Sequence, residues 1–119
     1  MNNNAAGRWA ERLARGIFVL KGFRILAANY VTGRGTQAGE VDFVARRGSL
    51  IVFAEVKQRS SLEKAAYAIS EKQKRRIING AAAFLQKHPE LNGCDIRFDA
   101  VLVELPFKIR HIKNAWSEY

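Results

Sequence analysis

Hydrophobic residues recur every three or four positions over residues 5–20, the spacing of one face of an α-helix. We therefore predict a helix there, whose apolar side consists of Trp9, Leu13, Ile17 and Leu20. Gly22 stands where a helix commonly ends. Trp9 is expected to belong to the core.

Three strand-like runs follow, at residues 23–30, 40–46 and 50–57. The last two are separated by Arg47-Gly48-Ser49, a short turn-forming segment that predicts an antiparallel hairpin. Both alternating faces of residues 50–57 are apolar, which is typical of a central strand covered on both sides. A glycine-rich, basic loop is expected at residues 32–39, before the hairpin.

The second half of the chain predicts one more helix and two more strands. Ser70 and Gln73 form a capping box that opens a helix with an apolar side made of Ile77, Ile78, Ala81, Phe84 and Leu85. His88-Pro89 ends this helix, because the residue before a proline disfavours helical geometry. Residues 96–105 resemble a strand, Pro106 interrupts it, and residues 107–112 are expected to form an edge strand.

The resulting order is α-β-β-β-α-β-β, which predicts an α/β fold with a mixed β-sheet flanked by helices. A length of 119 residues corresponds to a single domain, spanning residues 1–119. Because 48% of the residues are hydrophobic and 26% are charged, the composition is that of a globular protein and not of a disordered chain.

The charge balance indicates a polyanionic partner. The formal net charge is +9 and the sequence pI is about 10.2, which favours nucleic acid first and an anionic membrane surface second. A single cysteine, Cys94, excludes an internal disulfide and a zinc site built from several thiolates. The cytoplasm is the expected compartment, and no apolar run is long enough to span a membrane.

Two carboxylates and an ammonium group are expected to meet across the hairpin. Glu40 and Asp42 are predicted to share one face of their strand, opposite Val41 and Phe43, and a turn at residues 48–49 brings Asp42 beside Glu55. Like charges held close together need a neutralising cation, and carboxylate oxygens with a strand carbonyl are ligands that Mg²⁺ takes. The alternative is a solvated strand end where Glu55 and Lys57 form a surface ion pair.

These residues resemble a known family. Gly39-Glu40-x-Asp42 followed by Phe53-Ala54-Glu55-Val56-Lys57 is similar to the motif of the PD-(D/E)XK nuclease superfamily. Within the superfamily, the chain resembles the small bacterial YraN-like proteins, which are similar to archaeal Holliday-junction resolvases. The resemblance implies a restriction-endonuclease-like fold and a Mg²⁺- or Mn²⁺-dependent endonuclease that hydrolyses DNA, including branched or otherwise structured DNA.

The resemblance also assigns roles to individual residues. It makes Asp42 and Glu55 metal ligands together with the carbonyl of Val56, and it makes Lys57 the residue that orients or activates the attacking water. Glu11 matches a first-helix glutamate that contributes to the site in related resolvases, although an exposed helical charge is an equal alternative. Further supporting candidates are Glu40, Gln73 and Asp99. The motif departs from the superfamily pattern at Val41, where proline is expected, and in the longer loop at residues 33–39.

Basic residues supply candidate contacts to phosphate groups. They lie in the loop, at the hairpin turn, after the second hairpin strand and at the start of the second helix, and they are Arg34, Arg46, Arg47, Arg59, Lys72, Lys74, Arg75 and Arg76. An ordinary solvated helical face explains the last four equally well. Asp99 is either a supporting carboxylate or a hydrogen-bonding residue at the edge of the core, and His88, Cys94 and His111 are expected to have no chemical role.

Three functions remain open at this stage. The first is a metal-dependent endonuclease acting by in-line attack of water on a backbone phosphorus, and a junction-cleaving enzyme of this kind is expected to be a homodimer. The second is a nucleic-acid-binding protein that retains the nuclease fold without turnover. The third is an adaptor whose basic surface only aids solubility.

Overall fold

The computed structural model describes residues 3–33, 35, 38–66, 68–104 and 108–117. Five strands form one sheet in sequence order: β1 (Arg24–Thr32), β2 (Gly39–Arg47), β3 (Leu50–Gln58), β4 (Asp95–Glu104) and β5 (Lys108–Trp116). All neighbours are antiparallel except β3 and β4, which run parallel. The predicted mixed sheet is therefore confirmed, with β5 extending four residues beyond its predicted end. Pro106 and Phe107, predicted to break and to begin strands, lie outside the described residues, as does Arg34.

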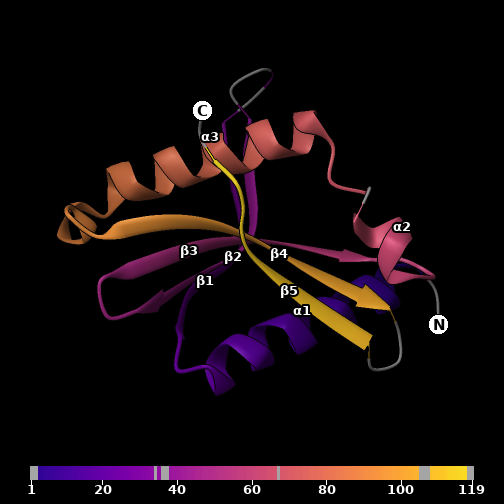
Figure 1. The fold of residues 1–119 in the computed structure, drawn as a ribbon. Helices are drawn as coiled ribbons and strands as arrows, with labels where there is room; N and C mark the ends of the chain where they lie inside the picture. The colour runs from indigo at the N-terminus through magenta and orange to yellow at the C-terminus, as the bar shows by residue number, and fades with distance from the viewer. Residues whose placement is uncertain (1–2, 34, 36–37, 67, 105–107, 118–119) are drawn as a thin grey trace.

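Helices cover both faces of the sheet, as the sequence predicts (Figure 1). Helix α1 (Asn3–Leu20) lies against one face and α3 (Glu71–Lys87) against the other. Two short elements were not predicted: helix α2 (Leu62–Ala66) after β3, and the 3₁₀ helix η2 (Pro89–Leu91) before β4. The parallel strands β3 and β4 need a crossover connection, which α2 and α3 provide.

Helix α1 packs through small side chains and not through Trp9. Its buried residues recur every four positions and are Ala6, Ala10, Ala14 and Phe18. A stripe of alanines lets the helix lie close to the sheet, and the larger Leu13 packs at the margin of the core. Trp9 is 43% exposed, so its predicted core position is wrong. The reason is that the alanine stripe, and not the bulky apolar stripe, faces the sheet.

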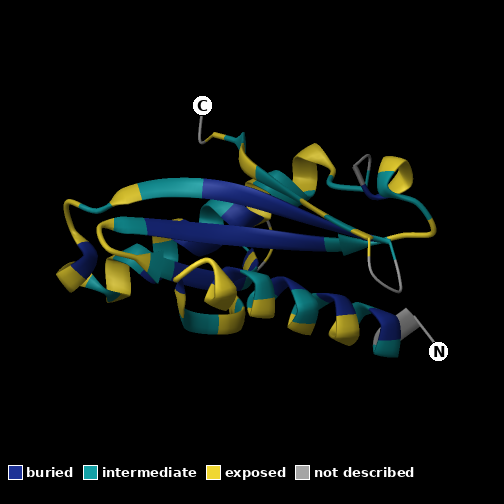
Figure 2. Ribbon diagram, turned by 60° about the horizontal axis from the view of Figure 1, so that its bottom comes forward, coloured by how far each residue is buried: buried dark blue, intermediate teal, exposed yellow. Residues whose placement is uncertain are grey.

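The sheet is buried on both faces at β3 (Figure 2). One cluster, beneath α1, contains Phe18, Phe43, Val52 and Val101, and the other, beneath α3, contains Val44, Phe53, Ile77 and Phe84. The expected central position of this strand is confirmed, because β2 and β4 flank it and both clusters contact it.

The start of α3 agrees with the predicted capping box. The hydroxyl of Ser70 accepts a hydrogen bond from the backbone N–H of Gln73 at 3.1 Å, and the Oε1 of Gln73 accepts one from the N–H of Ser70 at 3.2 Å. These bonds satisfy two N–H groups that a helix start leaves unpaired. The helix then ends at Lys87 with His88 as its C-cap residue, in agreement with the predicted end at His88-Pro89.

Candidate active site

The sheet divides between β2 and β3, and this fork creates the candidate site. The two strands pair from Arg47–Leu50 to Phe43–Ala54, the register predicted from the hairpin turn. Beyond that pair, β2 continues alongside β1 only, while β3 continues alongside β4. Side chains from both helical layers can therefore approach one another through the sheet at this point.

Asp42 stands where the strands separate. Its Oδ2 accepts a hydrogen bond of 2.7 Å from the backbone N–H of Val56, so a carboxylate takes the place of a strand carbonyl. The predicted common face of Val41 and Phe43 is wrong, because Val41 packs on the α3 side and Phe43 on the α1 side. The alternation changes at Asp42, at the level where Asn29 of β1 adopts a positive φ of 53°.

Glu55 is the most buried acid of the site, with 9% of its surface exposed. Burial raises the pKa of Glu55 to about 9, and the hydrogen bond and negative charge of Asp42 add to the rise, while Lys57 opposes it. Glu55 is consequently protonated at neutral pH and forms a side-chain hydrogen bond with Asp42. The surface ion pair considered for Glu55 and Lys57 does not describe this arrangement, because Glu55 is buried against a second carboxylate.

A cavity of about 180 Å³ opens at the fork. It is lined by Glu11, Glu40, Asp42, Glu55, Val56, Lys57, Gln73 and Arg76. These residues come from α1, β2, β3 and α3, so the cavity collects side chains from four elements. All eight were candidates on sequence grounds, and the structure brings them together, whereas their roles stay predictions.

Glu11 reaches the cavity from α1. The pKa of its carboxyl is raised by burial first and then by the charges of Asp42 and Glu40, against the lowering effect of Arg15. A freely solvated helical charge would not be affected by the acids of β2 in this way. The position of Glu11 therefore favours a part in the site over the alternative of an exposed charge.

A close approach of two backbones positions α3 over the cavity. A Cβ atom added to Gly39 would lie 2.4 Å from the backbone nitrogen of Gly80, so neither position leaves room for a side chain. The side-chain amide of Asn79 also donates to the carbonyl of Ala38 at 3.2 Å. These contacts join the start of β2 to the middle of α3, and they hold Gln73 and Arg76 at the cavity.

The cavity lacks a complete side-chain cage for a metal. Among the described residues, no group of three or more His, Cys, Asp or Glu side chains is arranged to hold a metal ion. The available donors are the paired carboxylates of Asp42 and Glu55 with the backbone carbonyl of Val56. This set fits Mg²⁺, which keeps several water ligands and binds through one or two carboxylates.

The comparison with known proteins concerns this same stretch of chain. The model of the uncharacterised protein family UPF0102 matches residues 10–103. A UPF0102 protein of Paramagnetospirillum magneticum is 50% identical over 111 residues, covering 92% of this chain and 85% of the relative. One of Nitrobacter winogradskyi is 47% identical over 112 residues, covering 94% and 92%. The chain belongs to the UPF0102 family. The matched range contains every residue that lines the cavity.

The predicted cations of this UPF0102 protein fall into separate groups. Arg76 lines the cavity and Arg59 lines a neighbouring groove. Lys72, Arg75 and Arg76 line a further cavity of about 560 Å³ beside Gly35 and Ala38. Lys74 instead pairs with Glu71 at 3.0 Å.

Arg46 and Arg47 lie at the other end of the hairpin from the fork. Arg46 donates to the carbonyl of Gly48 at 2.9 Å. Arg47 donates to the carbonyl of Lys21 at 2.9 Å and stacks over the ring of Phe23 at 4.4 Å. Seven residues of extended strand, roughly 23 Å, separate this end of β3 from Lys57.

Asp99 belongs to a buried network on β4, not to the cavity. Its carboxylate accepts two bonds of 2.8 Å from Arg97, one of 2.6 Å from His111 and one of 3.0 Å from the N–H of Asn114. Burial alone would raise the pKa of Asp99, but these bonds and the charge of Arg97 outweigh it and hold the pKa below its usual value. Of the two interpretations left open, this geometry favours the hydrogen-bonding one.

Both histidines contact other side chains in the fold. His111 bonds Asp99 and also lies with its Nδ1 2.7 Å from the Nζ of Lys21. His88 stacks on Phe84 with ring centroids 4.0 Å apart. The contacts join distant parts of the sequence or depend on helix geometry, so spacing alone did not reveal them.

No helix in the described part of the chain is both long and apolar enough to cross a membrane.

Proposed function

We propose that this UPF0102 protein is a metal-dependent endonuclease of the PD-(D/E)XK type that hydrolyses DNA phosphodiester bonds with Mg²⁺ or Mn²⁺. One observation carries the proposal: the carboxyl groups of Asp42 and Glu55 are hydrogen-bonded to each other in a cavity that Lys57 also lines. Two acids pressed together in this way bind a divalent cation in place of the proton. The net charge of +9 supports a polyanionic substrate.

The residues of the cavity would have different roles in hydrolysis. Asp42, Glu55 and the carbonyl of Val56 would hold the cation, which when bound polarises the phosphate and makes water a better nucleophile. Lys57 lies beside them and would orient the attacking water and stabilise negative charge that develops on the phosphate oxygens. Arg76, on the α3 side of the cavity, would hold a phosphate oxygen.

Glu11 and Gln73 complete the cavity from opposite layers. The raised pKa of Glu11 lets this carboxyl exchange a proton at the site, and its carboxylate form would accept a hydrogen bond from the attacking water. The side chain of Gln73 is engaged through its Oε1 in the capping box, which leaves its amide N–H groups as donors toward the cavity. Glu40 adds negative charge that strengthens the attraction for a cation.

The second candidate function is a nucleic-acid-binding protein that keeps this fold without turnover. The observation that favours it is the absence, within the described residues, of a third acidic or histidine side chain arranged as a metal ligand. In that case the cations beside the cavity would bind phosphates, and the acids of the fork would remain protonated or paired. The two functions differ in whether a divalent cation permits cleavage.

The deciding experiment offers the purified protein linear, circular and four-way DNA in Mg²⁺, in Mn²⁺ and in EDTA. We expect cleavage only with a divalent cation, and loss of cleavage in Glu55→Gln. The matched control is Glu90→Gln, which changes an exposed acid of η2 remote from the fork. DNA that is bound but never cleaved would favour the second function, and DNA that is not bound would reject the nuclease.

A further inference from the structure

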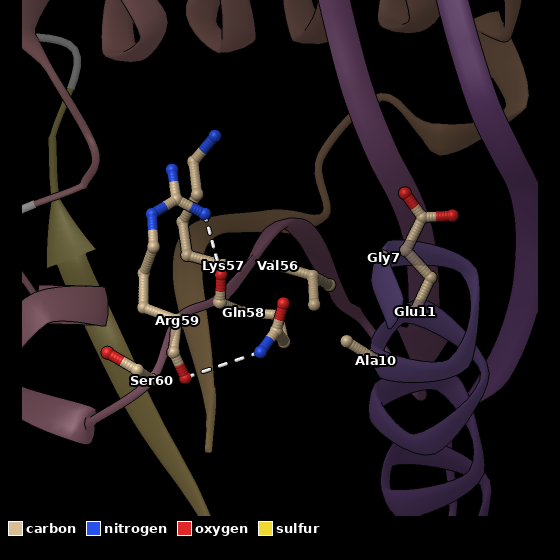
Figure 3. Close-up of a pocket in the computed structure, with 8 residues that line it drawn as sticks. All are labelled: Gly7, Ala10, Glu11, Val56, Lys57, Gln58, Arg59 and Ser60. Atoms are coloured by element: carbon tan, nitrogen blue, oxygen red, sulfur yellow. Dashed lines mark hydrogen bonds between the residues drawn. The ribbon is translucent and has the colours of Figure 1, made fainter. Parts of the chain in front are cut away.

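A groove of about 580 Å³ adjoins the cavity at the fork, which is the proposed catalytic cavity (Figure 3). Metal binding does not explain this groove. It is lined by Gly7, Ala10, Glu11, Val56, Lys57, Gln58, Arg59 and Ser60. Glu11, Val56 and Lys57 line both spaces, so the groove and the cavity lie side by side. Whatever occupies the groove therefore lies beside the reacting phosphate.

Small residues of α1 create the space. Ala10 is 1% exposed and lies at the side of the groove that α1 forms, and Gly7 precedes it by one turn. A Cβ atom at Gly7 would meet nothing within 4 Å. Glycine is less favourable than alanine or leucine inside a helix. Gly7 therefore lowers the local stability of α1, but it leaves the groove open.

Side chains of opposite charge type, basic on one side and acidic on the other, line the groove. Figure 3 shows Lys57 and Arg59 on one side, extending in the same direction, and Glu11 on the other. The guanidinium of Arg59 donates to the carbonyl of Gln58 at 2.6 Å, and the amide of Gln58 donates to the carbonyl of Arg59 at 3.3 Å. The cations suit a phosphate, while Glu11 and Gln58 offer hydrogen-bonding groups to a sugar or a base.

The groove and the catalytic cavity differ in volume, and therefore in the ligands that each can hold. Sites for small organic ligands are about 300–1,000 Å³ in volume, so the groove of about 580 Å³ lies within this range. The catalytic cavity of about 180 Å³ lies below it and has room for a cation, water and phosphate oxygens only. The groove is thus large enough to hold a whole nucleotide near the cut bond.

We propose that the groove holds an unpaired nucleotide of the DNA strand, next to the phosphate that is cut. A base inside a duplex is stacked and paired, and it must leave the stack to enter such a pocket, at a cost of a few kcal/mol. The protein should therefore prefer single-stranded DNA, or a single-stranded flap, over blunt duplex. This inference rests on the proposed function and names its substrate class.

The space beyond the catalytic cavity extends the same path. Arg76 lines both the catalytic cavity and the cavity of about 560 Å³ that contains Lys72 and Arg75. A strand that leaves its nucleotide in the groove and its reacting phosphate at the fork would meet these cations with its next phosphates. Neighbouring spaces share lining residues, so the three lie in a row from the groove with Ser60 to the cavity with Lys72.

The test fills the groove without disturbing the fold. Gly7→Leu places a side chain in the open groove, and the matched control Gly16→Leu makes the same change at an exposed position of α1 where a Cβ also meets nothing within 4 Å. Thermal unfolding should show both variants at least as stable as the wild type, because leucine favours a helix more than glycine does. Fluorescence anisotropy in Ca²⁺ then measures binding of a labelled single strand, a flapped duplex and a blunt duplex.

We expect Gly7→Leu to weaken binding of the single strand and the flap by about tenfold or more, equivalent to about 1.4 kcal/mol, and to leave the blunt duplex unaffected. Gly16→Leu should bind like the wild type. Undiminished single-strand binding in Gly7→Leu, or a wild type that prefers blunt duplex, would overturn the inference. If no DNA is cleaved in any metal while Gly7→Leu still loses the single strand, the groove stands and the nuclease proposal fails.

Discussion

Asp42 accepts a 2.7 Å hydrogen bond from the backbone N–H of Val56, fourteen residues away on the neighbouring strand. The N–H of Val56 would otherwise lack a partner on β2, because the pairing of β2 with β3 ends at Phe43 and Ala54. The same carboxylate faces Glu55. One side chain therefore closes the fork structurally and also forms half of the candidate metal site.

These two tasks of Asp42 can be separated by substitution. Asp42→Asn keeps an oxygen that accepts from Val56 but removes the charge, so the fold should persist while Mn²⁺ binding is lost in isothermal titration. Asp42→Ala should also lower the free energy of unfolding by about 1–3 kcal/mol, because it leaves a buried N–H unsatisfied. A Mn²⁺ isotherm in Asp42→Asn equal to that of the wild type would show that the metal site is elsewhere.

The raised pKa of Glu55 predicts how stability and metal binding depend on pH. The folded state holds this proton more tightly than the unfolded chain, so the stabilisation is full below pH 4.5 and is lost as pH rises toward about 9. Without metal, Glu55→Gln should consequently gain stability over the wild type as pH rises, measured by urea unfolding at several pH values.

Mn²⁺ should show the complementary dependence, because the cation must displace the proton of Glu55. Its affinity is expected to rise by about tenfold per pH unit over the neutral range and to level off near pH 9. Affinity that does not vary between pH 6 and 8 would mean that Glu55 is already ionised in the folded protein.

The sequence was sufficient for the order of the strands and the two long helices and for the hairpin register, because both depend on local signals. The turn at Gly48 sets the pairing of β2 with β3, and Ser70 with Gln73 marks the start of α3. Local patterns also indicated Asp42 and Glu55, since the register alone places these two near each other.

The rest of the site depends on packing that local patterns do not record. Alternation predicted that Val41 and Phe43 share a face, but the strands part at Asp42 and the alternation changes there. The helical pattern predicts a core position for Trp9 because it is based on large apolar residues and gives the small alanines no weight. The groove beside Glu11 was missed because glycine and alanine, Gly7 and Ala10, carry no chemical signal, although both lie within one turn of Glu11 on the same helix.

Lys57 is expected to act on the reaction and not on metal binding. Lys57→Met retains the aliphatic stem and removes the charge, and cleavage should fall by about 10²–10³-fold, the usual cost of losing one electrostatic stabiliser. Mn²⁺ affinity should stay equal or rise slightly, because a positive charge beside the cation is gone. Lys87→Met, at the exposed end of α3, is the matched control. Undiminished cleavage in Lys57→Met would remove Lys57 from the mechanism.

Asp99 should matter for stability and not for the site. Asp99→Asn removes the buried charge that pairs with Arg97 and His111, and breaking such a buried pair costs about 3–5 kcal/mol in the free energy of unfolding. Because the pKa of Asp99 is lowered in the folded state, its contribution is full above pH 3.8 and is lost as pH falls below that value. Loss of Mn²⁺ binding in an Asp99→Asn protein that is still folded would assign it to the site after all.

The cations divide into those along the proposed strand path and those at the hairpin turn. Each phosphate neutralised on single-stranded DNA contributes about −0.7 to the slope of log affinity against log salt. Lys72→Ala with Arg75→Ala, on the α3 side of the fork, should therefore flatten this slope by about 1.4. The double variant Arg46→Ala with Arg47→Ala should leave it unchanged, because these side chains lie at the other end of β3 and already bond backbone carbonyls. Anisotropy across a salt series in Ca²⁺ measures both slopes. A flatter slope in the second variant alone would place the DNA along the hairpin turn and away from the fork.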